Sequence, residues 1–230
     1  MKKVRFLITA LALVFIVSAA APRMAQSAIW STAVTDPQLW DDSRSSVNGI
    51  TGQGSWSTGF NLSWVISNDG GGIWTYEYTV STEEMDISHF ILEVTDDEFG
   101  FSILGGSSSG IDSEAPKTYD SSAGNPGMPN PFYGIKFDFG ADGGDVTYTL
   151  VTDRSPVYGV FYAKDGKTGG IDNIAYSNAL SYIDFRTNDS LTAADFIVRP
   201  NGEPVPVPGA MWLLGSGLLG VMGLRRRFRQ

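Results

Sequence analysis

The sequence predicts an all-β fold, either an antiparallel β-sandwich or a jelly roll, and three observations support this prediction. Short runs in which aromatic or β-branched residues alternate with polar ones recur from residue 29 onward. Clusters of Gly, Asn, Asp and Ser separate these runs, as turns separate strands. No segment of this region keeps an apolar period of 3.6 residues, so a helical or α/β fold is disfavoured.

The clearest element is a β-hairpin over residues 60–80. Apolar residues occupy every second position of 60–66, and aromatic or apolar residues do so again in 74–80. Between the two runs, residues 68–72 read Asn-Asp-Gly-Gly-Gly, a composition that accepts positive φ and therefore predicts the turn. Residues 87–94 follow as a strand with apolar residues on both faces, which implies partial burial of both.

The rest of this region continues the pattern, with one long interruption. Residues 105–131 are rich in Gly, Ser, Pro and Asn, so we expect a loop without a regular strand ladder. A loop of this length is either a binding element or a poorly ordered segment. Shorter turns are expected at 141–144 and 164–170. Further strands are expected at 133–139, 146–150, 157–163, 180–185 and 196–198.

The first 28 residues have the three parts of a secretory signal peptide. Residues 1–6 carry a basic cluster, residues 7–21 are apolar, and residues 25–28 are mostly small. Cleavage is favoured over a permanent anchor, because 15 apolar residues are short for a membrane span. The export translocon and signal peptidase are therefore expected partners, and residues 29–199 are expected to form the exported β-sandwich domain.

The C-terminal stretch consists of a proline-alternating segment, an apolar run and an arginine cluster. Residues 200–208 contain alternating prolines, which favour an extended linker. The uncharged run at 209–224 predicts a short transmembrane helix with a glycine-rich face. Residues 225–230 form an Arg-rich tail, which the positive-inside rule places in the cytoplasm.

Together these three parts resemble the PEP-CTERM sorting signal of Gram-negative bacteria. The residues that carry the resemblance are Pro204, Pro206, Pro208, Gly215, Gly217, Arg225, Arg226 and Arg227. The resemblance implies that the membrane enzyme exosortase is a partner. It also implies a transient inner-membrane anchor, a cut near the proline motif, and delivery to the cell surface or the exopolysaccharide matrix.

The proline motif departs from the usual Pro-Glu-Pro of this signal. Residues 204–208 read Pro-Val-Pro-Val-Pro, which looks like the Val-Pro-x-Pro variant. The departure leaves open which exosortase subtype acts and which bond it cuts. An ordinary C-terminal membrane anchor is the alternative interpretation.

Composition excludes several kinds of function. The chain has no cysteine, so disulfides, thiolate nucleophiles and Cys-bearing metal sites are excluded. The formal net charge of −9 understates the acidity of residues 29–203, which hold all 25 acidic residues and only eight basic ones. Such a surface repels a phosphate backbone, so nucleic acid is not an expected partner.

The sequence does not indicate an enzyme. His89 is the sole histidine, and its strand position between apolar neighbours favours a structural role over that of a general base. The acidic bends at 83–86 and 96–98 support the alternative of a secreted polysaccharide-active enzyme that uses turn carboxylates. Adjacent turn acids usually point into water, however, so no catalytic residue is assigned.

Calcium is the one cofactor that the sequence admits. Carboxylates and free carbonyls can converge in Gly-rich turns, although ordinary turn aspartates are the simpler interpretation. The aspartates in such turns are Asp69, Asp142, Asp145, Asp165 and Asp172. None of them completes a calcium-loop pattern, so no metal ligand is assigned.

Tryptophans suggest a molecular role for the exported domain. Trp30, Trp40 and Trp56 lie in polar, irregular surroundings where an exposed ring could stack on a sugar. Trp64 and Trp74 are instead expected in the core, on the apolar faces of strands. We therefore expect a non-catalytic glycan-binding module of the cell surface or exopolysaccharide matrix, with a purely structural surface protein as the alternative.

Overall fold

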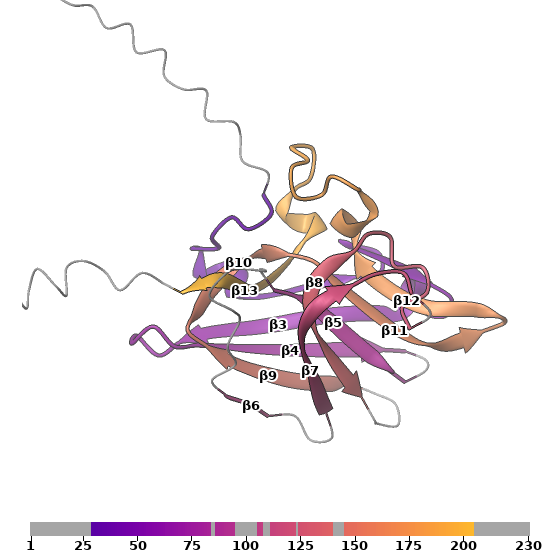
Figure 1. Ribbon diagram of the computed structural model, residues 1–230, viewed down its shortest axis with the longest axis horizontal. Helices are drawn as coiled ribbons and strands as arrows, with labels where there is room; N and C mark the ends of the chain where they lie inside the picture. Colours follow the sequence, from indigo (N-terminus) through magenta and orange to yellow (C-terminus); the bar gives the residue numbers. More distant parts are fainter. Residues whose placement is uncertain are drawn as a thin grey trace, which may run out of the picture.

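The computed structural model describes residues 29–83, 86–94, 105–107, 111–122, 124–139 and 145–204 (Figure 1). The expected signal peptide, the apolar run at 209–224 and the Arg-rich tail lie outside the described residues. Within the described ranges, no helix is long and apolar enough to cross a membrane.

Five of the described strands form one antiparallel sheet, in the order β1-β3-β4-β9-β6. Their bounds are β1 Asp41–Ser45, β3 Phe60–Asn68, β4 Trp74–Thr82, β9 Val146–Thr152 and β6 Gly105–Ser107. The expected hairpin is confirmed, because β3 and β4 pair continuously from Phe60 opposite Thr82 to Asn68 opposite Trp74. Gly70 in the turn has a φ of 80°, which a residue with a Cβ rarely adopts.

Six further strands form a second antiparallel sheet, in the order β2-β12-β11-β5-β8-β7. Their bounds are β2 Ile50–Gln53, β12 Ile171–Ser177, β11 Phe161–Thr168, β5 His89–Glu93, β8 Phe132–Phe139 and β7 Ile111–Tyr119. A separate two-stranded ribbon pairs β10 Arg154–Gly159 with β13 Ile197–Pro204. The short helical turns are η1 Pro37–Trp40, α1 Trp56–Gly59, η2 Asn178–Ser181 and η3 Ala193–Asp195.

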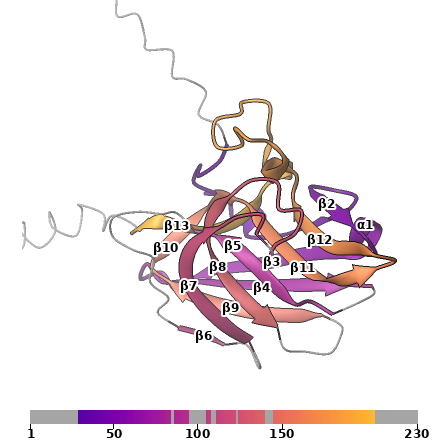
Figure 2. The ribbon, with the colours of Figure 1, turned by 45° about the vertical axis from the view of Figure 1, so that its right-hand side comes forward.

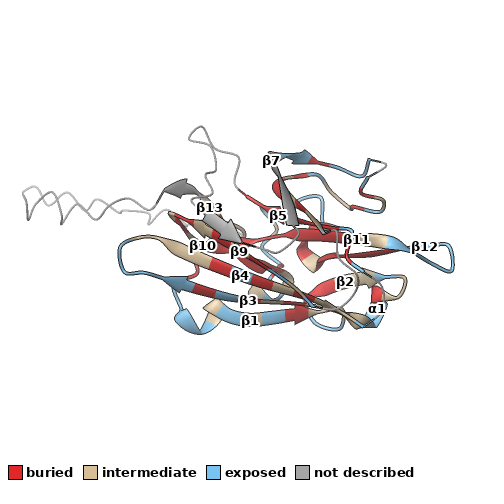
Figure 3. Cartoon of the chain, turned by 90° about the horizontal axis from the view of Figure 1, so that it is seen from below, coloured by how far each residue is buried: buried red, intermediate tan, exposed pale blue. Residues whose placement is uncertain are grey.

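The two large sheets share one aromatic core. The ring of Tyr148 on β9 lies 4.5 Å from Phe137 on β8 and 5.1 Å from Phe90 on β5, between ring centroids. Phe60 on β3 stacks on Phe161 of β11 at 5.9 Å. Figure 2 shows β5, β8 and β7 crossing in front of the strands of the other sheet, and Figure 3 shows the buried positions concentrated along the strands. The predicted all-β antiparallel class is confirmed, and the facing sheets are consistent with a sandwich.

The expected loop at 105–131 contains two strands that the composition did not predict. β6 and β7 occupy 105–107 and 111–119, and β7 pairs with β8 along most of its length. Pro116 lies where the register of this pair shifts, between Glu114 and Lys117, and β7 is an edge strand. An edge strand with a bulge tolerates proline, because its missing N–H removes no ladder hydrogen bond there.

The strand expected at 180–185 is absent from the described structure. These residues begin inside η2 and continue as local turns, in which the Tyr182 amide donates to the Ala179 carbonyl and the Phe185 amide to the Tyr182 carbonyl. Ile183 is 90% exposed, while Phe185 is buried in the core. The alternating pattern of residues 180–185 therefore predicted a strand, whereas the structure has turns with local hydrogen bonds at these positions.

Two expected boundaries also differ from the structure. β11 continues through Thr168, so the turn expected over 164–170 is confined to Gly169 and Gly170, whose φ values are 60° and 86°. β13 continues through Pro204, so residues 200–204, expected in the linker, pair with β10 instead. Arg199 is fully buried in this strand, which ties the end of the domain to its core.

Residues 120–122 and 124–131, here called the cover loop, pack over the second sheet on the face opposite the aromatic core. The Tyr162 hydroxyl of β11 donates to the carbonyl of Pro126 at 2.7 Å. The Asn130 side chain donates to the Leu180 carbonyl at 2.8 Å. Both faces of β5 are consequently buried, as its two-sided apolar pattern predicted.

Candidate functional site

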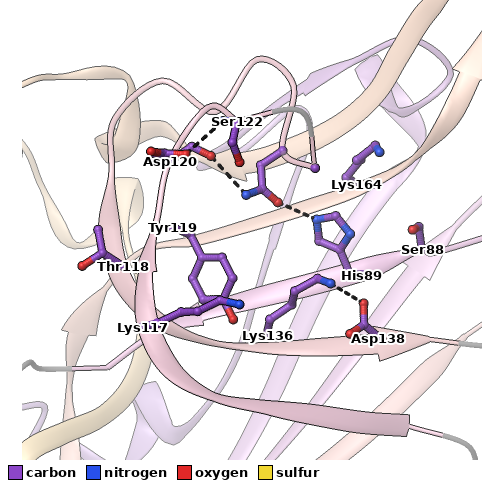
Figure 4. Close-up of a pocket in the computed structure, with 12 residues that line it drawn as sticks. Ser88, His89, Lys117, Thr118, Tyr119, Asp120, Ser122, Lys136, Asp138 and Lys164 are labelled. Carbon is purple, nitrogen blue, oxygen red and sulfur yellow. Dashed lines mark hydrogen bonds and ion pairs between the residues drawn. The ribbon is translucent and has the colours of Figure 1, made fainter.

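A cavity of about 410 Å³ lies between the cover loop and the outer face of the second sheet (Figure 4). The strand register brings its floor together, because Lys164 of β11 lies opposite His89 of β5, and His89 lies opposite Asp138 of β8. Lys136 precedes Asp138 by two residues and therefore lies on the same face of β8. The rim comes from β7, with Lys117 and its neighbours.

His89 fastens the cover loop to this floor. Its Nε2 atom lies 3.0 Å from Oδ1 of Asn125, and the Asn125 amide group donates to the Asp120 carbonyl at 3.1 Å. His89 is 5% exposed as a result. Burial, together with the neighbouring Lys136 and Lys164, lowers the pKa of His89 to about 4, and the bond to Asn125 opposes this shift. The imidazole is therefore neutral at pH 7.

Lysines are concentrated around this cavity. Residues 29–203 contain four lysines, and three of them, Lys117, Lys136 and Lys164, line it from three different strands. The fourth, Lys167, is exposed and pairs with Asp172 at 3.2 Å. Sequence reasoning missed this cluster, because lysines 19 and 28 residues apart become neighbours only through the order of the strands.

The described lining is richer in lysine than the domain as a whole. It holds three lysines and two aspartates, Asp120 and Asp138. Residues 29–203 as a whole carry eight basic and 25 acidic residues, a balance of −17. Lys136 is paired with Asp138 at 2.6 Å, and the Lys117 ammonium lies 5.1 Å from the ring centroid of Tyr119. The cavity thus gathers lysines within an acidic domain, and two of the three have described partners.

A second cavity, of about 340 Å³, adjoins the first and contains Trp30. Thr118 lines both cavities. The Trp30 indole N–H donates to the carboxylate of Glu93 at 3.0 and 3.1 Å, and the Arg186 guanidinium lies 5.4 Å from the ring centroid. Trp30, one of the three tryptophans proposed as sugar contacts, therefore lines a cavity.

Glu93 and Arg199 form a buried charge pair beneath this second cavity. Glu93 is 1% exposed and Arg199 is fully buried, and the Arg199 Nε atom lies 3.5 Å from the Glu93 carboxylate. The Val160 amide donates to the same carboxylate at 2.9 Å. Burial lowers the pKa of Arg199, and the Glu93 carboxylate opposes that shift. The pair joins β5 to β13 inside the domain.

Trp40 and Trp56 do not form the exposed surfaces that the sequence suggested. Trp56 is fully buried, because α1 turns its ring into the core, where it lies 5.1 Å from Phe60. Trp40 is half-buried, donates to the Val34 carbonyl at 2.9 Å and meets Trp74 edge-on at 5.1 Å. Trp56 as a sugar contact is therefore wrong. Trp64 is buried as expected, and Trp74 packs at the edge of the core.

Asp69, one of the turn aspartates, has a local role in its own turn. The Asp69 carboxylate accepts from the amides of Gly71 and Ile73 at 2.7 and 3.0 Å, and these bonds lower its pKa. Among the described residues, no group of three or more His, Asp or Glu side chains could hold a metal ion. Asp142 and the bend at 96–98 lie outside the described residues.

The sorting segment begins at the edge of the described structure. Pro204 is the last residue of β13 and lies opposite Arg154 of β10. The remaining positions of the predicted signal, from Pro206 and Pro208 to Arg225, Arg226 and Arg227, lie outside the described residues, as do Gly215 and Gly217.

Comparison with known proteins identifies this segment but not the domain before it. The family model described as the PEP-CTERM protein-sorting motif matches residues 204–227. Neither the curated proteins nor the solved structures give a match to the chain. The match implies processing by exosortase, export and sorting to the cell surface.

Proposed function

We propose, on the premise that the chain carries a PEP-CTERM protein-sorting motif, that it is an exosortase-sorted surface or matrix protein whose β domain binds glycans without catalysis. The observation that supports the sorting part is the motif at 204–227. The signal peptide at 1–28 and the transient inner-membrane anchor at 209–224 belong to this proposal. They would deliver residues 29–204 to the exported side of the membrane.

The cavity beneath the cover loop supports the glycan-binding part. Its volume of about 410 Å³ lies within the usual range for small-ligand sites, roughly 300–1,000 Å³. Its lining combines hydroxyl, amide, carboxylate and ammonium groups, from Ser122, Asn125, Asp120 and Lys164 among others. Such groups match the hydroxyls of a sugar, which both donate and accept hydrogen bonds.

The interactions of these groups support the non-catalytic part of the proposal. His89 is held by Asn125 and buried to 5% exposure, so its described role is to position the cover loop. Asp138 is paired with Lys136. A glycosidase needs two carboxyl groups that flank one bond, whereas the Asp138 carboxylate is held in this ion pair.

The sorting part is tested by replacing Pro204, Pro206 and Pro208 together with Ala in a host that has exosortase. We expect the full-length protein to accumulate in the inner membrane, because the motif is no longer processed. Pro37→Ala, at an exposed proline of η1, is the matched control and should be released normally. Normal surface release of the triple variant would contradict the sorting proposal.

The glycan-binding part is tested by retention of the purified full-length chain, in detergent, on polysaccharide isolated from the host. Retention that free polysaccharide competes away supports a binding module. Passage without retention, with or without added calcium, would favour the purely structural alternative.

A further inference from the structure

We infer that the peptide bond cut during sorting follows one of residues 204–208, and that the ribbon of β10 and β13 excludes every bond before Pro204. This inference rests on the proposed sorting function and narrows the site of processing. The matched motif begins at Pro204, and β13 ends at the same residue. The downstream limit is Pro208, because the cut is expected near the proline motif and the apolar run begins at the next residue.

The ribbon takes up residues that the sequence assigned to the linker. β10 and β13 lie side by side (Figure 1, Figure 2). Their pairing runs from Ile197 opposite Gly159 to Pro204 opposite Arg154, with one shift of register on the way. Only residues 205–208 of the expected linker therefore follow the last paired position.

Two tyrosines of β4 fasten the two strands of the ribbon to the first sheet. The Tyr76 hydroxyl donates to the Arg154 carbonyl at 2.7 Å, and the Tyr78 hydroxyl donates to the Val198 carbonyl at 3.0 Å. Both tyrosines are fully buried, so water does not compete for these bonds. The bond to Arg154 fixes β10 at the position that faces Pro204.

The start of β13 is anchored by a buried charge. Arg199 is fully buried, and its guanidinium donates to the Pro200 carbonyl at 2.9 Å and to the Ser31 hydroxyl at 3.0 Å. Its Nε atom lies 3.5 Å from the Glu93 carboxylate. Opening the ribbon as far as Arg199 would separate this pair, which is costly. Fraying is therefore expected only in the last residues of β13.

Cleavage inside a paired strand requires that the strand first opens. The rate of such a cut follows the population of the opened state. Enzymes that bind an extended peptide engage its backbone N–H and C=O groups, which in β13 already pair with β10. A cut after Pro204 needs no opening and leaves the ribbon of the released domain intact.

The chemistry of the cut defines what is measured. The peptide C–N bond breaks, and the carbonyl carbon bonds to the oxygen of water or to the nitrogen of an acceptor amine. The proton released by that water or amine goes to the nitrogen of the departing tail. The domain therefore ends in a free carboxylate or in an amide, and either form identifies the last residue.

The test reads the C-terminus of the protein that a host with exosortase releases, by mass spectrometry of the intact chain and of its last peptide. We expect chains that end at 204–208 to outnumber chains that end before Pro204 at least about tenfold. This ratio requires only that opening the ribbon costs about 1.4 kcal/mol.

A matched pair of variants tests the role of the ribbon. Tyr76→Phe keeps the ring but removes the hydroxyl bound to Arg154, so chains that end before Pro204 should increase about fivefold, the factor for one hydrogen bond of about 1 kcal/mol. Tyr162→Phe removes a hydroxyl whose bond, also 2.7 Å, goes to the Pro126 carbonyl in the cover loop. Its product ends should stay within about twofold of the unchanged chain.

Hydrogen exchange in the purified full-length chains, in detergent, gives a second measurement that does not depend on exosortase. The amides of β13 should exchange faster in Tyr76→Phe than in Tyr162→Phe. Thermal unfolding of both variants checks that each one folds.

Each outcome decides for or against the inference. Chains that end mainly before Pro204 or beyond Pro208 would overturn it while the sorting proposal stands. Surface delivery of the uncut full-length chain would overturn both. Equal exchange in β13 and equal product ends for Tyr76→Phe and Tyr162→Phe would overturn the ribbon as the feature that sets the limit.

Discussion

The two faces of β5 are both buried, yet different interactions bury them. Phe90 and Leu92 point into the aromatic core between the sheets and are fully buried there. His89 and Glu93 point to the opposite face and are 5% and 1% exposed, because the cover loop, Trp30 and Arg199 satisfy their polar atoms. Apolar contact area stabilises the inner face, whereas hydrogen bonds and ion pairs stabilise the outer one.

This difference indicates which kind of perturbation should destabilise each face. Loss of volume should damage the inner face, because a close-packed core relaxes only partly around a cavity. Loss of charge or a change of pH should damage the outer face, because a buried polar group without its partner is costly. The predictions below separate the two faces, from the largest expected effect to the smallest.

Phe90→Ala should lower the free energy of unfolding by about 3–5 kcal/mol, the usual cost of truncating a buried aromatic ring. Phe90 contacts Phe161 and Tyr148, with ring centroids 5.4 and 5.1 Å away, so the cavity would open between the two sheets. Urea unfolding followed by tryptophan fluorescence measures the change. A loss below 1 kcal/mol would show that the inner face repacks around the missing ring. The proposed difference between the two faces of β5 would then be wrong.

Glu93→Gln should cost about 3–5 kcal/mol, although it removes almost no volume, because Arg199 would remain buried without its charge partner. The same urea titration measures it. The control is Glu77→Gln at an exposed position of β4, for which we expect a change within 0.5 kcal/mol, as is usual for surface sites. Similar results for the two variants would contradict the role given to the buried pair.

Lowering the pH should destabilise the outer face through His89. Its pKa is about 4 in the folded protein and about 6.5 in the unfolded chain, so between these values the unfolded chain binds a proton that the folded one does not. The free energy of unfolding should therefore fall by at most about 3 kcal/mol as the pH drops from 6.5 to 4, with no further loss from this group below pH 4.

His89→Gln provides the measurement, because it retains an amide that can bond to Asn125 but does not titrate. The difference in stability between the two proteins should shrink as the pH falls from 7 to 4.5 in urea titrations. Parallel pH profiles for the two proteins would assign the acid sensitivity to other groups.

Asn125→Ala should have the smallest effect, about 1 kcal/mol, since it removes the hydrogen bonds to His89 and to the Asp120 carbonyl without touching the core. Hydrogen exchange should report faster exchange in the cover loop and unchanged protection in β3 and β4. Uniformly faster exchange across both sheets would show that the loop and the core unfold together.

The sequence was most informative where one strand pairs with its neighbour in the chain. Alternation over 60–80 and the Asn-Asp-Gly-Gly-Gly turn predicted both strands of the hairpin and its buried face, because pairing across a short turn is encoded locally. The prediction from sequence failed for β7, because Pro116 and its neighbours indicated a loop. It also failed for residues 180–185, because their alternation indicated a strand. In both cases the deciding factor was sheet position, which lies beyond any local window.

The candidate site shows the same limit. Trp56 follows polar residues and was expected at the surface, but a single turn of helix directs its ring into the core. Lys117, Lys136 and Lys164 carry no motif in the sequence. Their convergence depends on β7, β8, β5 and β11 lying side by side.

By itself the sequence determined the all-β class, the acidity of the exported region and the sorting motif at 204–227, because composition, alternation and a contiguous signal are local properties. The tertiary structure decided which faces are buried, that β13 extends to Pro204, and where lysines gather. The physical reason is that strand order brings together residues far apart in the chain, and burial then changes what a side chain can do. His89 illustrates this, since burial and the neighbouring lysines lower its pKa and keep the imidazole neutral at pH 7.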